Sequence, residues 1–505
     1  MTDTLQEAPT AVKPINHWIG GMSVAGASGR IGAVYNPATG RQTGDVDFAS
    51  REEVDRAVAA AKAAFPAWRA TSLSKRADLF FRIRALFDAH RNDIARLLTA
   101  EHGKVHTDAL GEVARGLEIV EFACGIPHLL KGGYSEQAST GIDVYSIRQP
   151  LGVVAGITPF NFPVMVPLWM APVAVACGNA FILKPSEQDP SPSLRLAELF
   201  AEAGLPDGVF SVVHGDKEAV DAILHHPGIS GVSFVGSTPV AKYIYSTATS
   251  HGKRCQALAG AKNHMIVLPD ADIEMAADAA VSAGYGSAGE RCMAVSMVVA
   301  VGGAAEPLID AIKERIPKIK VGAGDEPGVE MGPLITREHR DRVVSYIERA
   351  PSEGAKVVVD GREGVNGEGF FVKPTLIDET KPGMSVYDDE IFGPVLGITR
   401  VETYGEALRL VNENPFGNGT AIFTRDGGVA RQFQFDAQVG MVGVNVPIPV
   451  PVAYYSFGGW KNSLFGDLHI YGPEGIQFYT RGKVVTSRWP DTATSKVDLG
   501  FPQTH

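Results

Sequence analysis

A cysteine that directly follows two charged residues is the first feature of this sequence that could do chemistry. In the stretch SAGERCMAVS, residues 287–296, Cys292 comes after Glu290 and Arg291. A cysteine thiolate is a strong nucleophile, so this position is a candidate for covalent catalysis. A free cysteine can also be no more than a small apolar side chain of the core. The residues alone leave both interpretations open.

A second candidate is the turn in SFVGSTPVAKYI, residues 233–244. Gly236 suits the turn, Ser237 or Thr238 can cap a helix, and Pro239 suits a first helical position. A strand that leads into such a helix N-terminus is a ready site for an anion such as a pyrophosphate. Because the usual GxGxxG pattern is absent, an ordinary capped helix remains an equal alternative.

The stretch ILKPSE adds two charged residues at the end of an apolar strand, Lys184 and Glu187. In doubly wound sheets, ligands bind beyond the carboxyl ends of the strands. A carboxylate there can accept hydrogen bonds from ribose hydroxyls, and a lysine can donate to a ribose or a phosphate. The alternative is a solvated pair on a loop.

The elements that must position these residues alternate between strand and helix. Residues 51–132 have the apolar spacing of helices, and Ser50 is a candidate cap for the first. The stretches 228–248 and 263–286 each indicate a strand, a turn and a helix. This alternation predicts a parallel, doubly wound sheet, with a second α/β region from about residue 298 to 445.

One apolar stretch is long enough to cross a bilayer, because no charged residue occurs from Leu151 to Leu183. Four prolines and two asparagines interrupt it. A buried strand–turn–helix–strand unit therefore fits better than a membrane span.

Composition narrows the class of protein. At 505 residues the chain predicts two or three domains, and its net charge of −11 argues against a nucleic-acid surface. Its four cysteines are too scattered for a disulfide framework or a CxxC metal site, so we expect no metal and a reducing compartment. The N-terminus lacks a basic and an apolar signal region, which favours a cytoplasmic location.

Together, six ordered motifs resemble those of the aldehyde dehydrogenase family: TPFNFP, LKPSE, FVGSTPV, GERCM, EIFGPVL and NPFGNGTAIFT. The resemblance covers about residues 30 to 490. It implies an α/β fold with a Rossmann-like doubly wound cofactor domain, an α/β catalytic domain and a small β oligomerisation arm. The implied boundaries are 1–131 and 152–258 for the NAD-binding domain, 259–465 for the catalytic domain, and 132–151 with 466–500 for the arm and C-terminal tail. A homo-oligomer, tetramer or dimer, is implied as well.

The resemblance also implies the roles of individual residues. Cys292 matches the catalytic nucleophile, and Asn161 matches the side chain that, with the Cys292 backbone N–H, holds the oxyanion of the thiohemiacetal. The positions that match the NAD site are Phe160, Lys184, Glu187, Gly236, Ser237, Glu390 and Phe392.

One departure from the family pattern changes the expected reaction. Hydrolytic members carry Glu-Leu-Gly-Gly-Lys where this chain has LAGAK, so Leu258 replaces the glutamate that activates water. Water needs a general base at neutral pH, whereas a thiol is already partly ionised. We therefore expect the acyl group to leave to coenzyme A, the alternative being that a carboxylate such as Glu290 takes over.

The stretches SAGERCMA, GAKNH and VNVPIPVPVAYYSFGGWKNS resemble the CoA-acylating branch of the family that acts on methylmalonate semialdehyde. That substrate carries a carboxylate, and Arg291 and Arg115 match the branch's two arginines, whose forks can hold it. Arg291 would also lower the pKa of Cys292. The expected products are propionyl-CoA, or acetyl-CoA from malonate semialdehyde, in valine or inositol breakdown. The alternatives are an NAD-dependent dehydrogenase of another semialdehyde, hydrolytic or acylating, and a catalytically silent scaffold.

Overall fold

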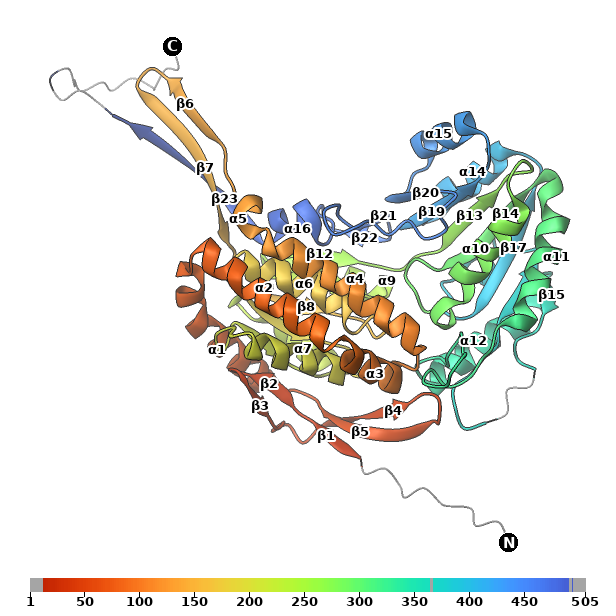
Figure 1. Cartoon of the computed structure of the whole chain (residues 1–505), viewed down its shortest axis with the longest axis horizontal. Helices are drawn as coiled ribbons and strands as arrows, with labels where there is room; N and C mark the ends of the chain where they lie inside the picture. The colour runs from red at the N-terminus through yellow and green to blue at the C-terminus, as the bar shows by residue number, and fades with distance from the viewer. Residues whose placement is uncertain (1–11, 364–366, 490–492, 494–505) are drawn as a thin grey trace, which may run out of the picture.

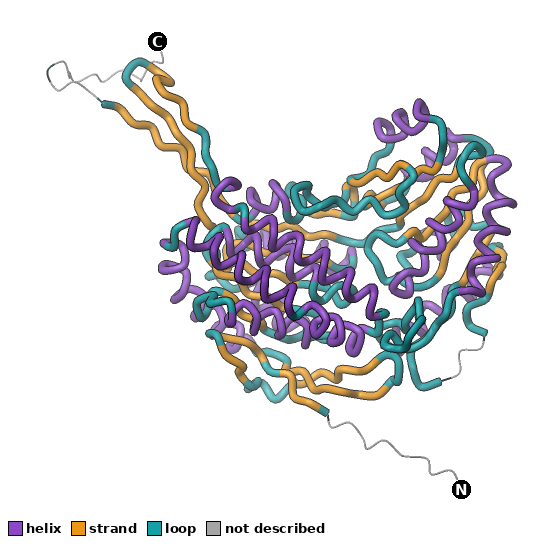
Figure 2. Tube along the Cα trace, in the orientation of Figure 1, coloured by secondary structure: helices purple, strands orange, loops and turns teal. Residues whose placement is uncertain are grey.

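Two large β-sheets organise the chain, and helices cover both of them (Figures 1 and 2). The computed structural model describes residues 12–363, 367–489 and 493. The sequence predictions that concern residues 1–11 and the tail from residue 494 to 500 lie outside the described residues.

The first large sheet contains the predicted doubly wound region. Its five middle strands, β12, β11, β8, β9 and β10, run parallel to one another. In spatial order the eight strands are β22 (Leu464–Phe465), β12 (Arg254–Leu258), β11 (Ile229–Val235), β8 (Val153–Ile157), β9 (Ala180–Lys184), β10 (Phe210–Val212), β2 (His17–Ile19) and β3 (Met22–Val24).

Both faces of this sheet are buried at its middle strands β8 and β9, which explains why these two strands are almost entirely apolar. Ala180 and Ile182 of β9 pack into one apolar cluster, whereas Phe181 and Leu183 pack into another. The first cluster includes residues of α1 (Arg51–Ala70), α8 (Lys217–His225) and α9 (Thr238–Ser250). The second includes residues of α2 (Leu73–Ala89), α3 (Arg91–His102), α4 (His106–Cys124), α6 (Met165–Ala176) and α7 (Ser191–Glu202).

The helical prediction for residues 51–132 is confirmed: α1 to α4 and the short α5 (Ile126–Leu129) occupy most of it. Ser50 is the N-cap of α1 and forms a capping box with Glu53, whose carboxylate accepts a hydrogen bond from the Ser50 N–H at 2.8 Å.

The long uncharged segment folds as predicted into β8, α6 and β9, all of them buried inside the protein. No helix within the described residues is long and apolar enough to cross a membrane.

The second large sheet is also parallel, except for its edge strand β15. In spatial order it contains β15 (Lys356–Val359), β16 (Thr375–Asp378), β17 (Val395–Val401), β14 (Val295–Val301), β13 (Asn263–Val267), β19 (Gly419–Phe423) and β20 (Met441–Val444). Its flanking helices are α10 (Ile273–Tyr285), α11 (Ala305–Arg315), α12 (Arg337–Arg349), α14 (Tyr404–Glu413) and α15 (Gly427–Asp436).

The start of this second region differs from the prediction made from strand–helix alternation. That pattern put it at about residue 298, but β13 already pairs with β14 and β19. A buried parallel strand has the same apolar pattern in either sheet, so only tertiary pairing decides which sheet it joins. The implied domain boundaries remain a prediction.

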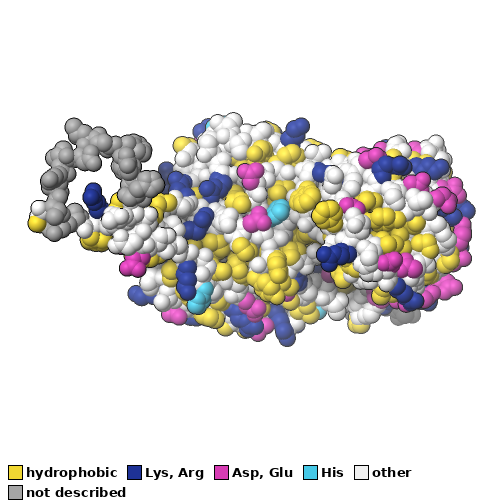
Figure 3. All heavy atoms as spheres, turned by 90° about the horizontal axis from the view of Figure 1, so that it is seen from above, with side chains coloured by type: hydrophobic (Ala, Val, Ile, Leu, Met, Phe, Trp, Pro, Cys, Tyr) yellow, Lys and Arg dark blue, Asp and Glu magenta, His cyan; other side chains and the backbone are white. Residues whose placement is uncertain are grey.

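A small antiparallel sheet projects from the body at the upper left of Figure 1. It contains β6 (Tyr134–Ser139), β7 (Ile142–Pro150) and β23 (Thr480–Arg488), so it joins segments far apart in the chain. A further three-stranded sheet of β1 (Lys13–Ile15), β5 (Arg41–Asp47) and β4 (Ile31–Asn36) lies at the bottom of the same view. Seen from above, basic and acidic side chains are interspersed on the surface (Figure 3).

Candidate active site

The candidate nucleophile lies where the carboxyl edge of the first sheet meets the amino edge of the second. Asn161 follows β8 of the first sheet, and Cys292 precedes β14 of the second. The Asn161 side-chain amide donates a hydrogen bond to the carbonyl of Glu290 at 3.0 Å, which ties the two edges together. Two residues that are more than a hundred positions apart therefore belong to one site.

The loop that carries Cys292 has an unusual backbone. After α10 the chain passes through Ser287 and Ala288, both with φ of 52°, and Gly289 with φ of 74°. Left-handed conformations are unfavourable for residues with a side chain, and such strain often marks functional loops. A side chain at Gly289 would collide with the carbonyl of Gly393, so this position requires glycine.

Two asparagines hold the backbone of the nucleophile. The side-chain amides of Asn263 and Asn418 donate to the Cys292 carbonyl at 2.9 and 3.2 Å. Asn263 lies in the motif GAKNH and Asn418 in NPFGNGT, but the motifs alone give neither asparagine a role.

The thiol of Cys292 is protonated at neutral pH in this structure. Burial, followed by the nearby Glu390 carboxylate, raises its pKa to about 12. The charge of Arg291 acts in the predicted, lowering direction, but its influence is smaller than that of burial.

The backbone around Asn161 is fixed by a buried ion pair. Lys104 donates to the Asn161 carbonyl at 2.7 Å and to the Glu112 carboxylate at 2.6 Å. Glu112 in turn accepts hydrogen bonds from the N–H groups of Val164 and Met165, where α6 begins. Asn161 keeps a second amide hydrogen for another acceptor, because an amide nitrogen carries two. Sequence reasoning missed Lys104 and Glu112, since nothing in their spacing points to a site.

The residues predicted for the nucleotide lie at the carboxyl ends of β9 and β11. Lys184 and Glu187 form an ion pair at 2.9 Å. Gly236 precedes α9, and Ser237 is the N-cap of that helix but makes no side-chain capping hydrogen bond. Thr238 accepts from the Gly260 N–H instead, at 3.0 Å. The first-turn N–H groups of α9 thus remain available for an anion.

Glu390, Phe392 and Phe160 gather on the side of Cys292 nearer to these nucleotide residues. Glu390 and Phe392 line one pocket with Cys292, and Glu390 accepts from the Ala261 N–H at 2.8 Å. The rings of Phe160 and Phe392 meet edge to face with centroids 5.9 Å apart. A side chain at Gly260 would come within 2.5 Å of the Glu390 carboxylate, so glycine is needed for this approach. Lys184, the N–H groups at the start of α9 and the Glu390 carboxylate together offer the hydrogen-bond donors and acceptors that a dinucleotide requires.

The two arginines predicted to bind a carboxylate lie on different elements and have different partners. Arg115 on α4 pairs with Glu118 at 2.7 Å and donates to the Pro451 carbonyl at 2.8 Å. Tyr471, which sequence reasoning missed, donates to that same carbonyl at 3.1 Å. Tyr471 also belongs to the apolar cluster against which Cys292 packs, and burial raises the pKa of its phenol.

The two positions that the sequence analysis connects with the choice of acyl acceptor, Leu258 and Glu290, are both buried. Leu258, at the end of β12, belongs to the same apolar cluster that Cys292 packs against. Glu290 accepts from the Ile335 N–H at 3.2 Å, and burial raises the pKa of its carboxyl well above the usual range. Burial disfavours the charged form of this carboxyl and keeps it from water, so Glu290 is poorly suited to replace a water-activating glutamate.

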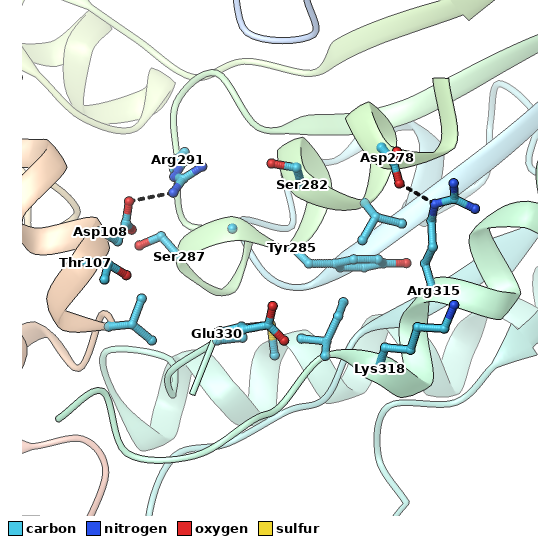
Figure 4. A pocket seen from close by; sticks show the side chains of 15 residues that line it. Thr107, Asp108, Asp278, Ser282, Tyr285, Ser287, Arg291, Arg315, Lys318 and Glu330 are labelled. Carbon is cyan, nitrogen blue, oxygen red and sulfur yellow. Dashed lines mark hydrogen bonds and ion pairs between the residues drawn. The ribbon is translucent and has the colours of Figure 1, made fainter. Parts of the chain in front are cut away.

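A cavity of about 540 Å³ extends from Arg291 between α4, α10 and the segment 318–331 (Figure 4). Arg291 and Asp108 face each other at one end, with an ion pair of 2.6 Å. Arg315 and Asp278 form a similar pair at the other end, also at 2.6 Å. Arg291 lines the pocket beside Cys292 as well, so its side chain separates the cavity from the thiol.

These features define an α/β protein with a half-buried thiol between two largely parallel sheets and a dinucleotide-type site beside it. Residues 24–485 match the model of the aldehyde dehydrogenase family. The chain belongs to the aldehyde dehydrogenase family, which confirms the resemblance seen in the sequence.

Individual relatives are similar over nearly their whole length. A malonate-semialdehyde dehydrogenase from Pseudomonas aeruginosa is 53% identical over 493 residues, which is 97% of this chain and 99% of that protein. The solved structure of a methylmalonate-semialdehyde dehydrogenase from Oceanimonas doudoroffii is 55% identical with a TM-score of 0.94, and covers 95% of this chain and 99% of that one.

A protein from Sinorhizobium meliloti 1021, provisionally named a methylmalonate-semialdehyde dehydrogenase and solved in complex with NAD, is 52% identical. Its TM-score is 0.95, and the match covers 96% of this chain and 100% of that one. The predicted fold class is therefore confirmed.

Proposed function

We propose that this protein oxidises malonate semialdehyde and methylmalonate semialdehyde with NAD and transfers the acyl group, after loss of the carboxylate, to coenzyme A. The observation that carries the proposal is that Arg291 lines one pocket together with Cys292. Arg115 and Tyr471 donate to the same Pro451 carbonyl, and Tyr471 belongs to the apolar cluster against which Cys292 packs, which supports a second arginine near the site. The names and cofactor of the similar proteins support the same substrates and NAD.

In the first step the Cys292 sulfur adds to the aldehyde carbon and forms a thiohemiacetal. Asn161 and the Cys292 backbone N–H donate hydrogen bonds to the oxygen as it becomes negative, which lowers the barrier because these donors are already in place. The thiol proton passes to solvent water before the sulfur attacks, since burial raises the pKa of Cys292 and keeps the resting thiol protonated. NAD, when bound, supplies the acceptor for the hydride that leaves this carbon.

Lys184, Glu187 and the N-terminus of α9 would hold the adenosine and phosphate end of the dinucleotide. Glu187 would accept from the ribose hydroxyls, and the α9 N–H groups would face the pyrophosphate. Glu390 and Phe392 would lie at the nicotinamide ribose, next to the thiol with which they share a pocket. Phe160 would contact the same end through its edge-to-face packing on Phe392.

Oxidation leaves an acyl group joined to the Cys292 sulfur as a thioester. In the malonyl-type thioester the bond to the carboxylate breaks, carbon dioxide leaves, and the α-carbon takes a proton. The coenzyme A thiolate then attacks the thioester carbonyl, and the Cys292 thiolate is the leaving group. This acceptor is favoured over water because Leu258 provides no base, and because burial disfavours the charged form of Glu290, whose carboxylate already accepts from the Ile335 N–H.

The decisive experiment incubates the protein with malonate semialdehyde and NAD, with and without coenzyme A, and identifies the products. We expect NADH together with acetyl-CoA when coenzyme A is present, and propionyl-CoA from methylmalonate semialdehyde. Free acid formed equally fast without coenzyme A would contradict the acyl transfer and favour hydrolysis. An absence of NADH with every semialdehyde would favour a catalytically silent scaffold.

We further propose a cytoplasmic homo-oligomer, tetramer or dimer, in which the small sheet of β6, β7 and β23 forms a contact between subunits. Its projection from the body supports this role.

A further inference from the structure

The guanidinium of Arg291 already has a carboxylate partner in this structure. Its Nη2 lies 2.6 Å from Oδ1 of Asp108, in the first turn of α4. The other oxygen, Oδ2, is buried and makes no hydrogen bond to any described residue. The remaining donors of Arg291 likewise make no hydrogen bond within the described part of the chain. The contact is thus a single hydrogen bond and not the two-point pair that arginine and a carboxylate can form.

The chain makes specific room for this arrangement. A Cβ at Gly286 would come within 2.5 Å of the Arg291 guanidinium, so a side chain there would force the arginine to move from this position. Asp108 and Arg291 are 183 residues apart in sequence and belong to the two different large units of the fold. Both line the cavity of about 540 Å³, which gives a small acid access to the pair (Figure 4).

We propose that Asp108 is a specificity-determining residue: an internal carboxylate that holds Arg291 until the carboxylate of the substrate replaces it. The inference rests on the proposed function, in which Arg291 binds that carboxylate. A substrate carboxylate can accept from two guanidinium N–H groups at once, whereas Asp108 accepts from one. Replacement of Asp108 by the substrate carboxylate is therefore favourable. An aldehyde without a carboxylate has nothing with which to displace Asp108.

The exchange also explains how one site can first bind a carboxylate and later lose it. An arginine that binds the carboxylate strongly at every step would stabilise it against decarboxylation. Asp108 lies beside Arg291 throughout and competes for the same donors. After carbon dioxide has left, Asp108 forms its hydrogen bond to Arg291 again. The half-buried charge of Arg291 is therefore not left without a partner.

The test uses Asp108→Asn, which keeps the shape of the side chain and removes its charge. Malonate, which carries the carboxylate but no aldehyde, is the binding probe, and its Kd is measured by titration calorimetry. Steady-state kinetics give KM and kcat for malonate semialdehyde and for propionaldehyde. We expect the Kd of malonate and the KM of malonate semialdehyde to fall about tenfold, because a charge-assisted competitor is gone. The KM for propionaldehyde should not change.

A matched control is Asp278→Asn, which removes the carboxylate of the Arg315 pair at the other end of the same cavity. It should change neither malonate binding nor the two KM values. Asp108→Ser is a second test variant, which also removes the carboxylate and suits a helix N-terminus, and it should reproduce the effect of Asp108→Asn. Circular dichroism checks that each variant is folded.

Weaker or unchanged malonate binding in both Asp108 variants would overturn the inference, because Asp108 would then support Arg291 or have no part in recognition. Equal changes for malonate semialdehyde and propionaldehyde would overturn it too, since they would indicate a structural role. If the wild-type protein neither binds malonate nor prefers the acid aldehyde, the proposed function fails as well. A wild-type preference for the acid with no effect of Asp108→Asn removes only this inference.

Discussion

At the scale of single residues, Cys292 is the proposed nucleophile, so its removal should abolish turnover without abolishing NAD binding. Cys292→Ala should lower kcat to below about a thousandth of the wild-type value while NAD still binds, because the nucleophile is lost and the nucleotide residues are not. Turnover is measured as NADH formation and NAD binding by fluorescence titration. Cys124→Ala, at the distant end of α4, is the control and should keep its turnover. Near-normal turnover in Cys292→Ala would disprove the assignment.

Arg115 should discriminate between substrates that differ only in their carboxylate. Arg115→Leu should lower kcat/KM for methylmalonate semialdehyde about tenfold to a hundredfold, because a hydrogen bond to a charged group is lost. Propionaldehyde, which presents the same reacting group without a carboxylate, should react almost as before. Equal losses with both aldehydes would mean that Arg115 supports the loop at Pro451 and does not contact the substrate.

Leu258 should control the choice between water and coenzyme A. Leu258→Glu should increase the release of free acid without coenzyme A, because it restores a carboxylate near the thioester. Burial raises the pKa of a glutamate at such a position towards neutrality, which suits a general base. Leu258→Gln, similar in size and polarity but without basicity, is the matched control. If both variants hydrolyse the acyl group at the wild-type rate, the dependence on coenzyme A has another cause.

At the scale of elements, the Lys104–Glu112 pair should contribute to both stability and the position of Asn161. Lys104→Met leaves the Glu112 charge buried without its partner, so we expect a loss of about 3–5 kcal/mol in the free energy of unfolding. Chemical denaturation measures this loss. Lys217→Met breaks an exposed pair with Asp221 of the same 2.6 Å length and should change the free energy of unfolding far less, because water screens this pair.

The outcome of the double variant Lys104→Met/Glu112→Leu tests the physical reason. It should recover part of the stability, because no unpaired charge remains in the interior. Activity should stay low, since the Asn161 carbonyl would still lack the lysine that fixes it. Full recovery of activity would show that Lys104 does not position Asn161.

Local patterns were sufficient to predict many elements. The capped helix after Ser50 and the strand–helix–strand unit between residues 151 and 184 follow from caps, prolines and apolar spacing. The residues YSIRQPLGVVAGI, in contrast, have one continuous strand pattern but divide into β7 and β8, which belong to different sheets. Gly152, with φ of 129°, makes the break, and a single glycine does not reveal where the chain then goes.

The candidate site was predictable only where motifs marked it. Cys292, Asn161 and Glu390 lie in such motifs, and the structure brings each of them to the contact between the two sheets. Asp108 and Tyr471 lie in no motif that the sequence analysis had used. Their roles come from partners 183 and 20 residues away, and no local pattern of residue types encodes a contact of this kind.

At the scale of the whole molecule, the small projecting sheet gives a test of assembly. Its strands β6 and β23 each have a free edge in the described structure, and Val484 on β23 is 68% exposed. Exposed edges and apolar side chains of this kind are usually covered by another chain. We therefore expect Val484→Lys to shift the protein to smaller species in sedimentation velocity experiments, because a buried lysine would lack a partner.

A comparable surface position provides the control for this last prediction. Met22 on β3 is 62% exposed and lies at the edge of the first large sheet, away from the projecting sheet. Met22→Lys should leave the sedimentation coefficient unchanged. If the wild-type protein sediments as a monomer, or if Val484→Lys retains the wild-type assembly, the projecting sheet is not a subunit contact. Because Cys292 lies in the body of the protein, loss of assembly with retained turnover would show that the active site is complete within one chain.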